Sequence, residues 1–299
     1  MTAVPAITIG EWPGWRRGAL ILTFDGVYAD TLGELRKLGA LDGAFVGTLF
    51  CIAGSIGGRV EGRQVASWSE LEVFARAGWE IANHSLTHPI PRDLRPAAIL
   101  SRTVHSAARL VRRGPGPVRD PVVNHRVSPS AYIADILAGG EMLGQRLGVP
   151  MRTFAYPHGR ATPAIQTALR DAGYIGARLA SGGSASGRVS RFAVPTHLWT
   201  ASVDRADSAE WLGAGGLCVE TYHVVGPHVD DYVWTTRSET LRGHLHDADA
   251  QGMWIATLAE AIEWMDCRAR AVVDVEPAST GWNVVLRGAS ELPVRIEAA

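Results

Sequence analysis

The residues best suited to chemistry in this sequence stand at the ends of apolar runs. Asp25, His84 and His223 each follow such a run, and the runs read ALILTF, WEIAN and LCVETY in chain order. An apolar run of this length is typical of a strand that is buried on both faces. Because barrel enzymes assemble their sites at the carboxyl ends of such strands, we expect the three side chains to converge.

A second histidine, His88, stands four residues after His84 in the segment HSLTH. This spacing can put two imidazoles on one side of a turn, where they bind a divalent cation. With Asp25, three nitrogen and oxygen ligands are available. A hydrogen-bonded structural pair is the alternative, since this spacing is a weak motif by itself. The position of the pair after a strand, with an aspartate ending the first strand, favours the metal site.

The composition bears on the class of partner. The 29 basic and 30 acidic residues nearly cancel, so no overall field attracts nucleic acid or an anionic membrane surface. We therefore expect a neutral small-molecule or oligosaccharide substrate, with no nucleic-acid and no membrane partner.

The N-terminal residues show no secretory pattern, which predicts a cytoplasmic protein. The three cysteines are far apart and predict buried free thiols. The sequence predicts no particular oligomeric state.

The elements that must position these residues alternate between strand and helix. Capping boxes at Ser67 and at Thr257 open two of the predicted helices. Alternation of this kind implies parallel strands with right-handed crossovers, and the length of the chain favours a (β/α) barrel over an open sheet. We predict an α/β barrel domain over residues 1–270. Residues 271–299 contain two alternating segments, 272–276 and 282–286, and predict a C-terminal β hairpin-like extension.

Several motifs in a fixed order make this sequence resemble a known family. The motifs TFDG at 23–26, NHSLTHP at 83–89 and FAYPHG at 154–159 are similar to those of the polysaccharide deacetylases, the NodB-homology family also known as carbohydrate esterase family 4. The similarity continues through AGYIGAR at 172–178, TYHVVG at 221–226 and WIATLAEAIEWM at 254–265, so it covers residues 18 to 268. The resemblance implies a distorted (β/α) barrel and the hydrolysis of an N-acetyl group on a sugar.

The resemblance also implies roles for single residues. His84 and His88 would hold a divalent metal, zinc first, with cobalt, nickel or manganese as alternatives. A carboxylate would take a proton from the attacking water, and His223 would give one to the leaving amine. Tyr156 and His158 would line the acetyl pocket, with backbone N–H groups near Tyr156 stabilising the oxyanion. A packed strand end is the alternative for both.

The first motif departs from the family pattern of two adjacent aspartates, a base followed by a metal ligand. This chain has Asp25 followed by Gly26. One alignment makes Asp25 the base and leaves Gly26 at the ligand position. The other makes Asp25 the ligand and leaves the base unassigned, so Asp25 is a candidate for both roles. Asp30 is a further candidate for the base, or else the acidic residue of a helix N-terminus.

Trp199 is the main candidate for an aromatic rim that stacks on the sugar, together with His197, His228 and Trp234; ordinary loop packing is the alternative. The leading hypothesis is a metal-dependent N-deacetylase that acts on an acetamido sugar or a glycosylated metabolite. One alternative is hydrolysis of a linear or cyclic amide C–N bond outside sugars. Another is a carbohydrate-binding homologue without catalysis, which the missing second aspartate motivates.

Overall fold

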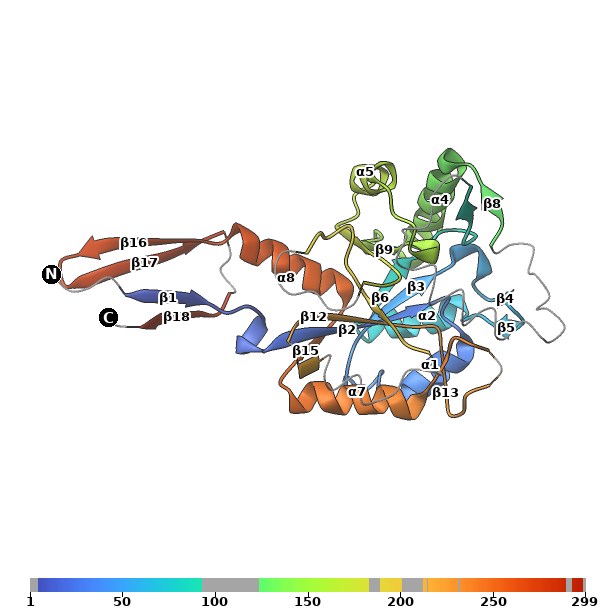
Figure 1. The fold of residues 1–299 in the computed structure, drawn as a ribbon, viewed down its shortest axis with the longest axis horizontal. Helices are drawn as coiled ribbons and strands as arrows, with labels where there is room; N and C mark the ends of the chain where they lie inside the picture. The colour runs from blue at the N-terminus through green and yellow to red at the C-terminus, as the bar shows by residue number, and fades with distance from the viewer. Residues whose placement is uncertain are drawn as a thin grey trace.

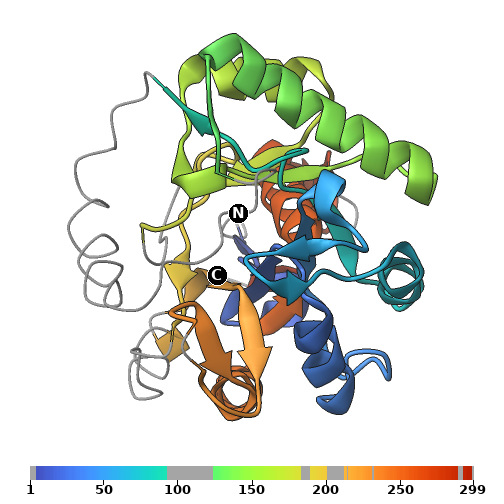
Figure 2. The ribbon, with the colours of Figure 1, turned by 90° about the vertical axis from the view of Figure 1, so that its right-hand side faces the viewer.

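The structure is a computed structural model that describes residues 5–92, 124–182, 189–200, 212–213, 215–230, 232–288 and 292–297. Its centre is a curled sheet of eight strands in the order β10-β9-β6-β3-β2-β12-β11, with β15 paired to β2 off this path. All of these pairings are parallel. The predicted α/β fold of the (β/α) barrel type is therefore confirmed (Figure 2). The strands are β2 (Gly18–Asp25), β3 (Thr48–Cys51), β6 (Glu80–Asn83), β9 (Thr153–Ala155), β10 (Gly176–Arg178), β11 (His197–Leu198), β12 (Gly216–Tyr222) and β15 (Trp254–Ala256).

Strand β2 lies at the centre of this sheet and is buried along its whole length. β12 follows one edge of β2, while β15 pairs with the first half of the other edge and β3 with its end. Ile21 packs in an inner apolar cluster with Val219, and Leu22 packs in an outer cluster beneath the helices. The apolar run of the sequence thus reflects burial on two faces, because side chains alternate along a strand.

Helices cover the outer face of the sheet, as Figure 2 shows for the long green helix α4 and the orange helix α7. Both predicted capping boxes are present: Ser67 caps α2 with Glu70, and Thr257 caps α8 with Glu260. These caps explain why the chain turns from strand to helix at those residues. The helices are α1 (Ala29–Lys37), α2 (Trp68–Arg76), α4 (Pro129–Leu147), α5 (Pro163–Asp171), α7 (Ser238–Ala250) and α8 (Leu258–Arg270).

An arm of paired strands extends away from the barrel (Figure 1). The predicted hairpin consists of β16 (Val272–Ala278) and β17 (Gly281–Arg287), which pair antiparallel. Beside it, β1 (Ala6–Ile9) pairs antiparallel with β18 (Val294–Glu297), a pairing that the sequence did not predict. Among the described residues, the buried apolar clusters take no side chain from β16 or β17. The boundary at residue 270 stays a prediction.

Three short strand pairs lie outside the main sheet and the arm. They are β4 (Arg59–Val60) with β5 (Arg63–Gln64), β7 (Ile90–Pro91) with β8 (Arg126–Val127), and β13 (Val224–Gly226) with β14 (Thr235–Arg237). Each includes a strand that closely follows a strand of the main sheet, so these pairs border the carboxyl ends of the barrel strands. None of the three cysteines forms a disulfide, and Cys51 and Cys218 are buried. Across the described ranges, no helix combines the length and apolar character needed to cross a bilayer.

Candidate functional site

The structure brings the predicted Asp25, His84 and His223 together at the carboxyl ends of β2, β6 and β12. Nε2 of His84 lies 3.7 Å from Oδ2 of Asp25, and His223 directly follows Tyr222, whose strand partner is Phe24, the residue before Asp25. The ring of His88 lies 4.7 Å from that of His84, and the ring of His158 lies 4.6 Å from that of His88. These residues lie at or just after the ends of four strands, β2, β6, β9 and β12, as the residues of barrel active sites do.

Asp25 is bound by a residue that the sequence analysis did not single out, Arg178 at the end of β10. Oδ1 of Asp25 accepts a hydrogen bond from Nη2 of Arg178, whose side chain is fully buried. Arg178 also donates to the carbonyl of Leu179 and lies over the ring of Phe50. Burial alone would raise the pKa of Asp25, but the charge of Arg178 and of the nearby histidines lowers it to about 2. Asp25 is therefore ionised, with Oδ2 facing His84.

Both histidines of the HSLTH segment are held in the form that binds metals. Nδ1 of His84 lies 2.8 Å from the carbonyl oxygen of Ala155, and Nδ1 of His88 lies 3.0 Å from Oδ1 of Asn124. Each Nδ1–H thus donates to an oxygen, which leaves the lone pair of Nε2 free, as in metal-ligating histidines. Burial lowers the pKa of His84 to about 3 and also lowers that of His88. Neutral imidazoles with free Nε2 atoms fit a divalent cation.

Asp25, the expected third metal ligand, fits a metal site less well than the two histidines do. Within the described part of the chain, no three His, Cys, Asp or Glu side chains are arranged as a metal site. Asp25 already pairs with Arg178, and only its second oxygen faces His84. The fit therefore holds for His84 and His88, and Asp25 stands beside them as a ligand or as a base, the two roles that the sequence left open.

The loop that carries both histidines is fixed by helix α4. Asp135 accepts hydrogen bonds from the backbone N–H groups of Leu86 and Thr87 and from the Thr87 hydroxyl at 2.6 Å. The backbone N–H of His88 donates to Oγ of Ser85 at 2.9 Å. These contacts explain how a short segment without regular structure presents two imidazoles in a defined geometry.

The residues proposed to line the substrate pocket separate into two groups. His158 is exposed beside His88, where a substrate can reach it. Tyr156 is instead buried in the outer core, and its hydroxyl donates to the carbonyl of Phe192 at 3.0 Å. The backbone N–H of Tyr156 donates to the backbone carbonyl of Arg178 at 3.2 Å. Tyr156 thus offers neither its side chain nor its N–H to the group of histidines.

The aromatic candidates separate in the same way. Trp234 stacks on His223 with the ring centres 5.3 Å apart, so it holds the imidazole in place. Trp199 is fully buried and packs between His197 and His244, which removes it from any exposed rim. His228 is exposed. In the described part of the chain, Nδ1 of His223 has no hydrogen-bond partner.

Left-handed backbone is concentrated around these histidines. His88 has φ 51° and His158 has φ 57°, in a region that residues other than glycine seldom adopt. Nearby non-glycine residues with positive φ are Val27, Glu61, Ser85 and Asn124. Strained backbone of this kind is found most often at functional sites. It is a signal that the sequence does not display.

The structure also describes Gly26, where the first motif departs from the family pattern, and the nearby Asp30. Gly26 has φ 78°, and a Cβ there would lie 3.2 Å from the ring of Tyr28. A carboxylate at position 26 would therefore strain the backbone and crowd Tyr28. Asp30 lies in the first turn of α1, bonded to the N–H of Thr31 and to Arg63. These contacts are those of a helix N-terminal acid, the second of the two roles considered.

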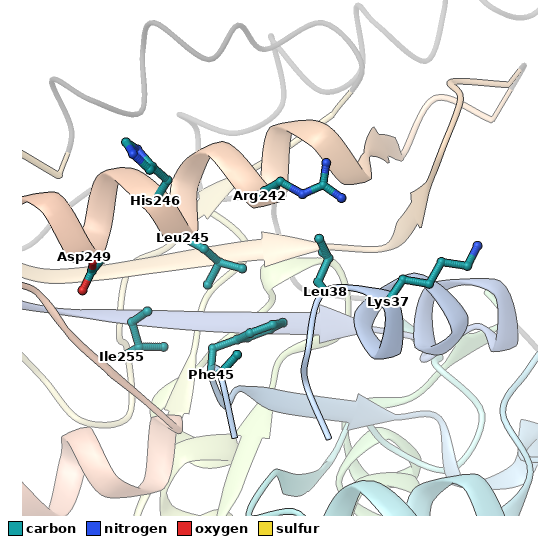
Figure 3. A pocket seen from close by; sticks show the side chains of 9 residues that line it. Lys37, Leu38, Phe45, Arg242, Leu245, His246, Asp249 and Ile255 are labelled. Atoms are coloured by element: carbon teal, nitrogen blue, oxygen red, sulfur yellow. The ribbon is translucent and has the colours of Figure 1, made fainter. Parts of the chain in front are cut away.

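A separate hollow lies on the outside of the barrel, between the end of α1 and the middle of α7 (Figure 3). Phe45 and Ile255 form part of its apolar floor, and Lys37, Arg242 and Asp249 stand at its edge. None of the predicted site residues lines it. The hollow is therefore separate from the candidate site at the strand ends.

Comparisons with solved structures find similar chains of low sequence identity. IcaB from Ammonifex degensii is 21% identical over 54% of this chain and 60% of its own, with a TM-score of 0.40. The Streptococcus pyogenes deacetylase PplD, in complex with acetate, is 16% identical over 58% of this chain and 61% of its own, with a TM-score of 0.42. This chain thus spans about three fifths of the length of these two proteins. A family 4 acetyl xylan esterase from Clostridium thermocellum with a cobalt ion is 16% identical over 82% of this chain and 90% of its own, with a TM-score of 0.49.

The comparison with protein families gives the assignment. No curated protein sequence is similar enough to this chain to count as a match. The model of the polysaccharide deacetylase family matches residues 16–177, more than half of the 299 residues. This range includes Asp25, His84 and His88 and ends one residue before Arg178. The resemblance found in the motifs is therefore confirmed, and the chain belongs to the polysaccharide deacetylase family.

Proposed function

We propose that the protein is a metal-dependent hydrolase that removes the N-acetyl group of an acetamido sugar. One observation carries the proposal: His84 and His88 present free Nε2 atoms beside the ionised Asp25, at the barrel end that also holds His223. This grouping supplies a cation site, an anion and a proton donor within one barrel end. Those are the parts that the hydrolysis of an amide requires.

His84 and His88 would hold the cation through Nε2, and zinc is the ion we propose, with cobalt, nickel or manganese as alternatives. When bound, such an ion polarises the acetyl carbonyl and makes its bound water more acidic. Oδ2 of Asp25 is the oxygen available to complete the ligand set or to take the proton of the water. In both cases Arg178 fixes the other oxygen and keeps the carboxylate charged.

His223 would donate a proton to the leaving nitrogen. Burial lowers the pKa of His223, so its resting imidazole is neutral and must gain a proton before it gives one. The negative charge of Asp25 acts in the opposite direction and favours the protonated form. Stacking on Trp234 holds the ring in one plane during this transfer.

The first experiment is elemental analysis of the purified protein together with acetate release from N-acetylated sugars. Wild type is compared with Asp25→Ala, His84→Ala and His223→Ala. The matched control is His246→Ala, which changes an exposed histidine of α7. We expect near-stoichiometric zinc in wild type and in the control, and loss of the metal in His84→Ala. His223→Ala should keep the metal and lose kcat by a factor on the order of 100 or more.

The pairing of Asp25 with Arg178 favours one competing function, a carbohydrate-binding homologue without catalysis. That function predicts sugar binding without metal and without acetate release. Release of ammonia or another amine from an amide that is not a sugar, with no acetate from any acetylated sugar, would instead support the alternative amide substrate. Unchanged turnover in His223→Ala would remove this residue from the mechanism.

A further inference from the structure

A second carboxylate stands near the site, and it belongs to a residue that the sequence analysis did not consider. Glu61 forms the turn between β4 and β5. Val60, the residue before it, packs in one apolar cluster with Tyr28 and with Val224, the residue after His223. Tyr28 in turn lies beside Gly26, the residue after Asp25, because a Cβ built on Gly26 would lie 3.2 Å from its ring. The turn that carries Glu61 therefore borders the barrel end that holds Asp25 and His223.

Contacts around Glu61 fix one of its oxygens and leave the other available. The Tyr232 hydroxyl donates to Oε2 of Glu61 at 2.6 Å. Tyr232 is itself held between the hydroxyl of Tyr28, 3.4 Å away, and the guanidinium of Arg63, which lies over its ring. Among the described residues, Oε1 of Glu61 has no hydrogen-bond partner. The side chain is exposed, so a ligand can reach this oxygen.

Arg63 does not neutralise Glu61, although the two residues share one turn. The guanidinium of Arg63 donates to Asp30 at 2.8 Å and to Asp230. Both of its terminal nitrogens are thus used by other carboxylates. A glutamate with a purely structural role would be expected to use the arginine beside it. Instead the charge of Glu61 stays available beside this barrel end.

The backbone at Glu61 argues against a structural role as well. Glu61 and Gly62 form a two-residue turn, with φ 50° and φ 79°, between the paired Val60 and Arg63. Turns with positive φ at both positions favour asparagine, aspartate or glycine at the first one. Glutamate is a poor choice for the turn itself. It shares this left-handed strain with His88 and His158, which suggests a selected function.

We propose that Glu61 is a substrate-binding residue whose free carboxylate oxygen accepts a hydrogen bond from a hydroxyl or amino group of the sugar that is deacetylated. The proposal rests on the function proposed above, because it needs the acetamide group to lie at the histidines. Carboxylates are acceptors only, so they select hydroxyl and ammonium groups. The rings of Tyr28 and Tyr232 pack edge to face behind this carboxylate.

The test uses the full-length protein loaded with zinc and tetra-N-acetylchitotetraose as the probe. Glu61→Gln removes the charge but keeps an oxygen for the Tyr232 hydroxyl, and Glu61→Asn suits the turn but is too short to reach the sugar. Glu72→Gln, an exposed glutamate of α2, is the matched control. We expect KM to rise by about tenfold or more in both Glu61 variants, with kcat within about twofold of wild type. Glu61→Asn should also unfold at the same temperature as wild type or higher.

Two results would overturn the proposal. One is an unchanged KM in Glu61→Gln while wild type releases acetate from the probe. The other is failure of the probe to bind wild type at all. If wild type binds the probe without releasing acetate, the deacetylase function fails for this substrate, and the role of Glu61 is then decided by the Kd from tryptophan fluorescence. A Kd about tenfold weaker in Glu61→Gln supports the role, and an equal Kd refutes it.

Discussion

His84 couples the stability of the protein to pH. Burial lowers its pKa from 6.5 to about 3 in the folded protein, whereas the unfolded chain exposes an ordinary histidine. At a pH between these two pKa values, His84 binds a proton in the unfolded state but not in the folded state. The stabilising contribution is therefore complete above the unfolded pKa and is lost as the pH falls toward the folded pKa.

This coupling predicts how unfolding responds to acid. In chelator-treated protein, the free energy of unfolding in urea should drop by about 2 kcal/mol between pH 7 and pH 5 through His84 alone. His84→Asn should remove most of that drop, because asparagine does not titrate. His246→Asn, whose wild-type side chain is 75% exposed, should keep the wild-type slope. Equal slopes in His84→Asn and wild type would show that this imidazole is not neutral in the folded protein.

The sequence identifies the residues of the site that follow apolar strands, and it fails for those fixed by tertiary contacts. Asp25, His84 and His223 are predictable, because parallel strands bring their carboxyl ends to one edge of the sheet. Arg178 ends the motif AGYIGAR, but only the structure shows that it points toward Asp25. Tyr156 and Trp199 have suitable chemistry, yet both side chains are buried in the core. Whether a strand-end side chain faces inward depends on a register that motifs do not reveal.

At the scale of elements, a buried polar group joins α7 to β12. Glu220, Tyr222 and His244 are all fully buried. The Tyr222 hydroxyl donates to Oε2 of Glu220 at 2.6 Å, and Nδ1 of His244 lies 3.0 Å from the same oxygen. A charged group in such a place is stable only while its partners satisfy it. The docking of α7 thus depends on this trio as well as on apolar packing.

The trio predicts strong coupling between two substitutions. His244→Leu should cost about 3–5 kcal/mol, because it leaves Glu220 buried beside a single hydroxyl. Adding Glu220→Met should recover a large part of that loss, since no unpaired charge remains. Urea unfolding of wild type, both single variants and the double variant measures the coupling energy. If the free-energy costs of the two single substitutions add up to that of the double variant, His244 does not compensate the charge of Glu220.

Elements were predictable where local signals mark both ends. The capping boxes at Ser67 and Thr257 gave the N-cap residues of α2 and α8 correctly, because a cap is a short-range chemical signal. Strands β1 and β18 were missed, since each has four residues and its partner stands at the other end of the chain. The two-residue strands β4 and β5, which position Glu61, are too short for any periodicity to show.

At the scale of the molecule, we propose that residues 271–299 are an extension that the barrel does not need for its fold. The hairpin of β16 and β17 contributes nothing to the buried apolar clusters among the described residues. Exposed valines such as Val272 and Val285 lie along it. The arm stands apart from the barrel end that carries the histidines (Figure 1).

Excision of the hairpin tests this division. Val272 and Arg287 are paired across the hairpin, so residues 273–286 can be replaced by two glycines without moving the flanking chain. We expect the free energy of unfolding to change by no more than about 1 kcal/mol, as for surface changes. The kcat for acetate release should be unchanged. A protein that no longer folds would show that the arm belongs to the barrel domain.

The pairing of β1 with β18 also sets the path of the chain as a whole. Because Ala6 pairs with Glu297, the first and last described strands lie side by side in the arm, as Figure 1 shows for β1 and β18. A linker of a few residues between Ala6 and Glu297 would therefore close the chain, and new ends would be opened at the exposed turn after Ala278. In such a circular permutant the barrel would be threaded in the same spatial order from a different starting point. The path of the chain is thus nearly a closed loop, so its starting point can be moved without changing which strands of the central sheet pair with one another.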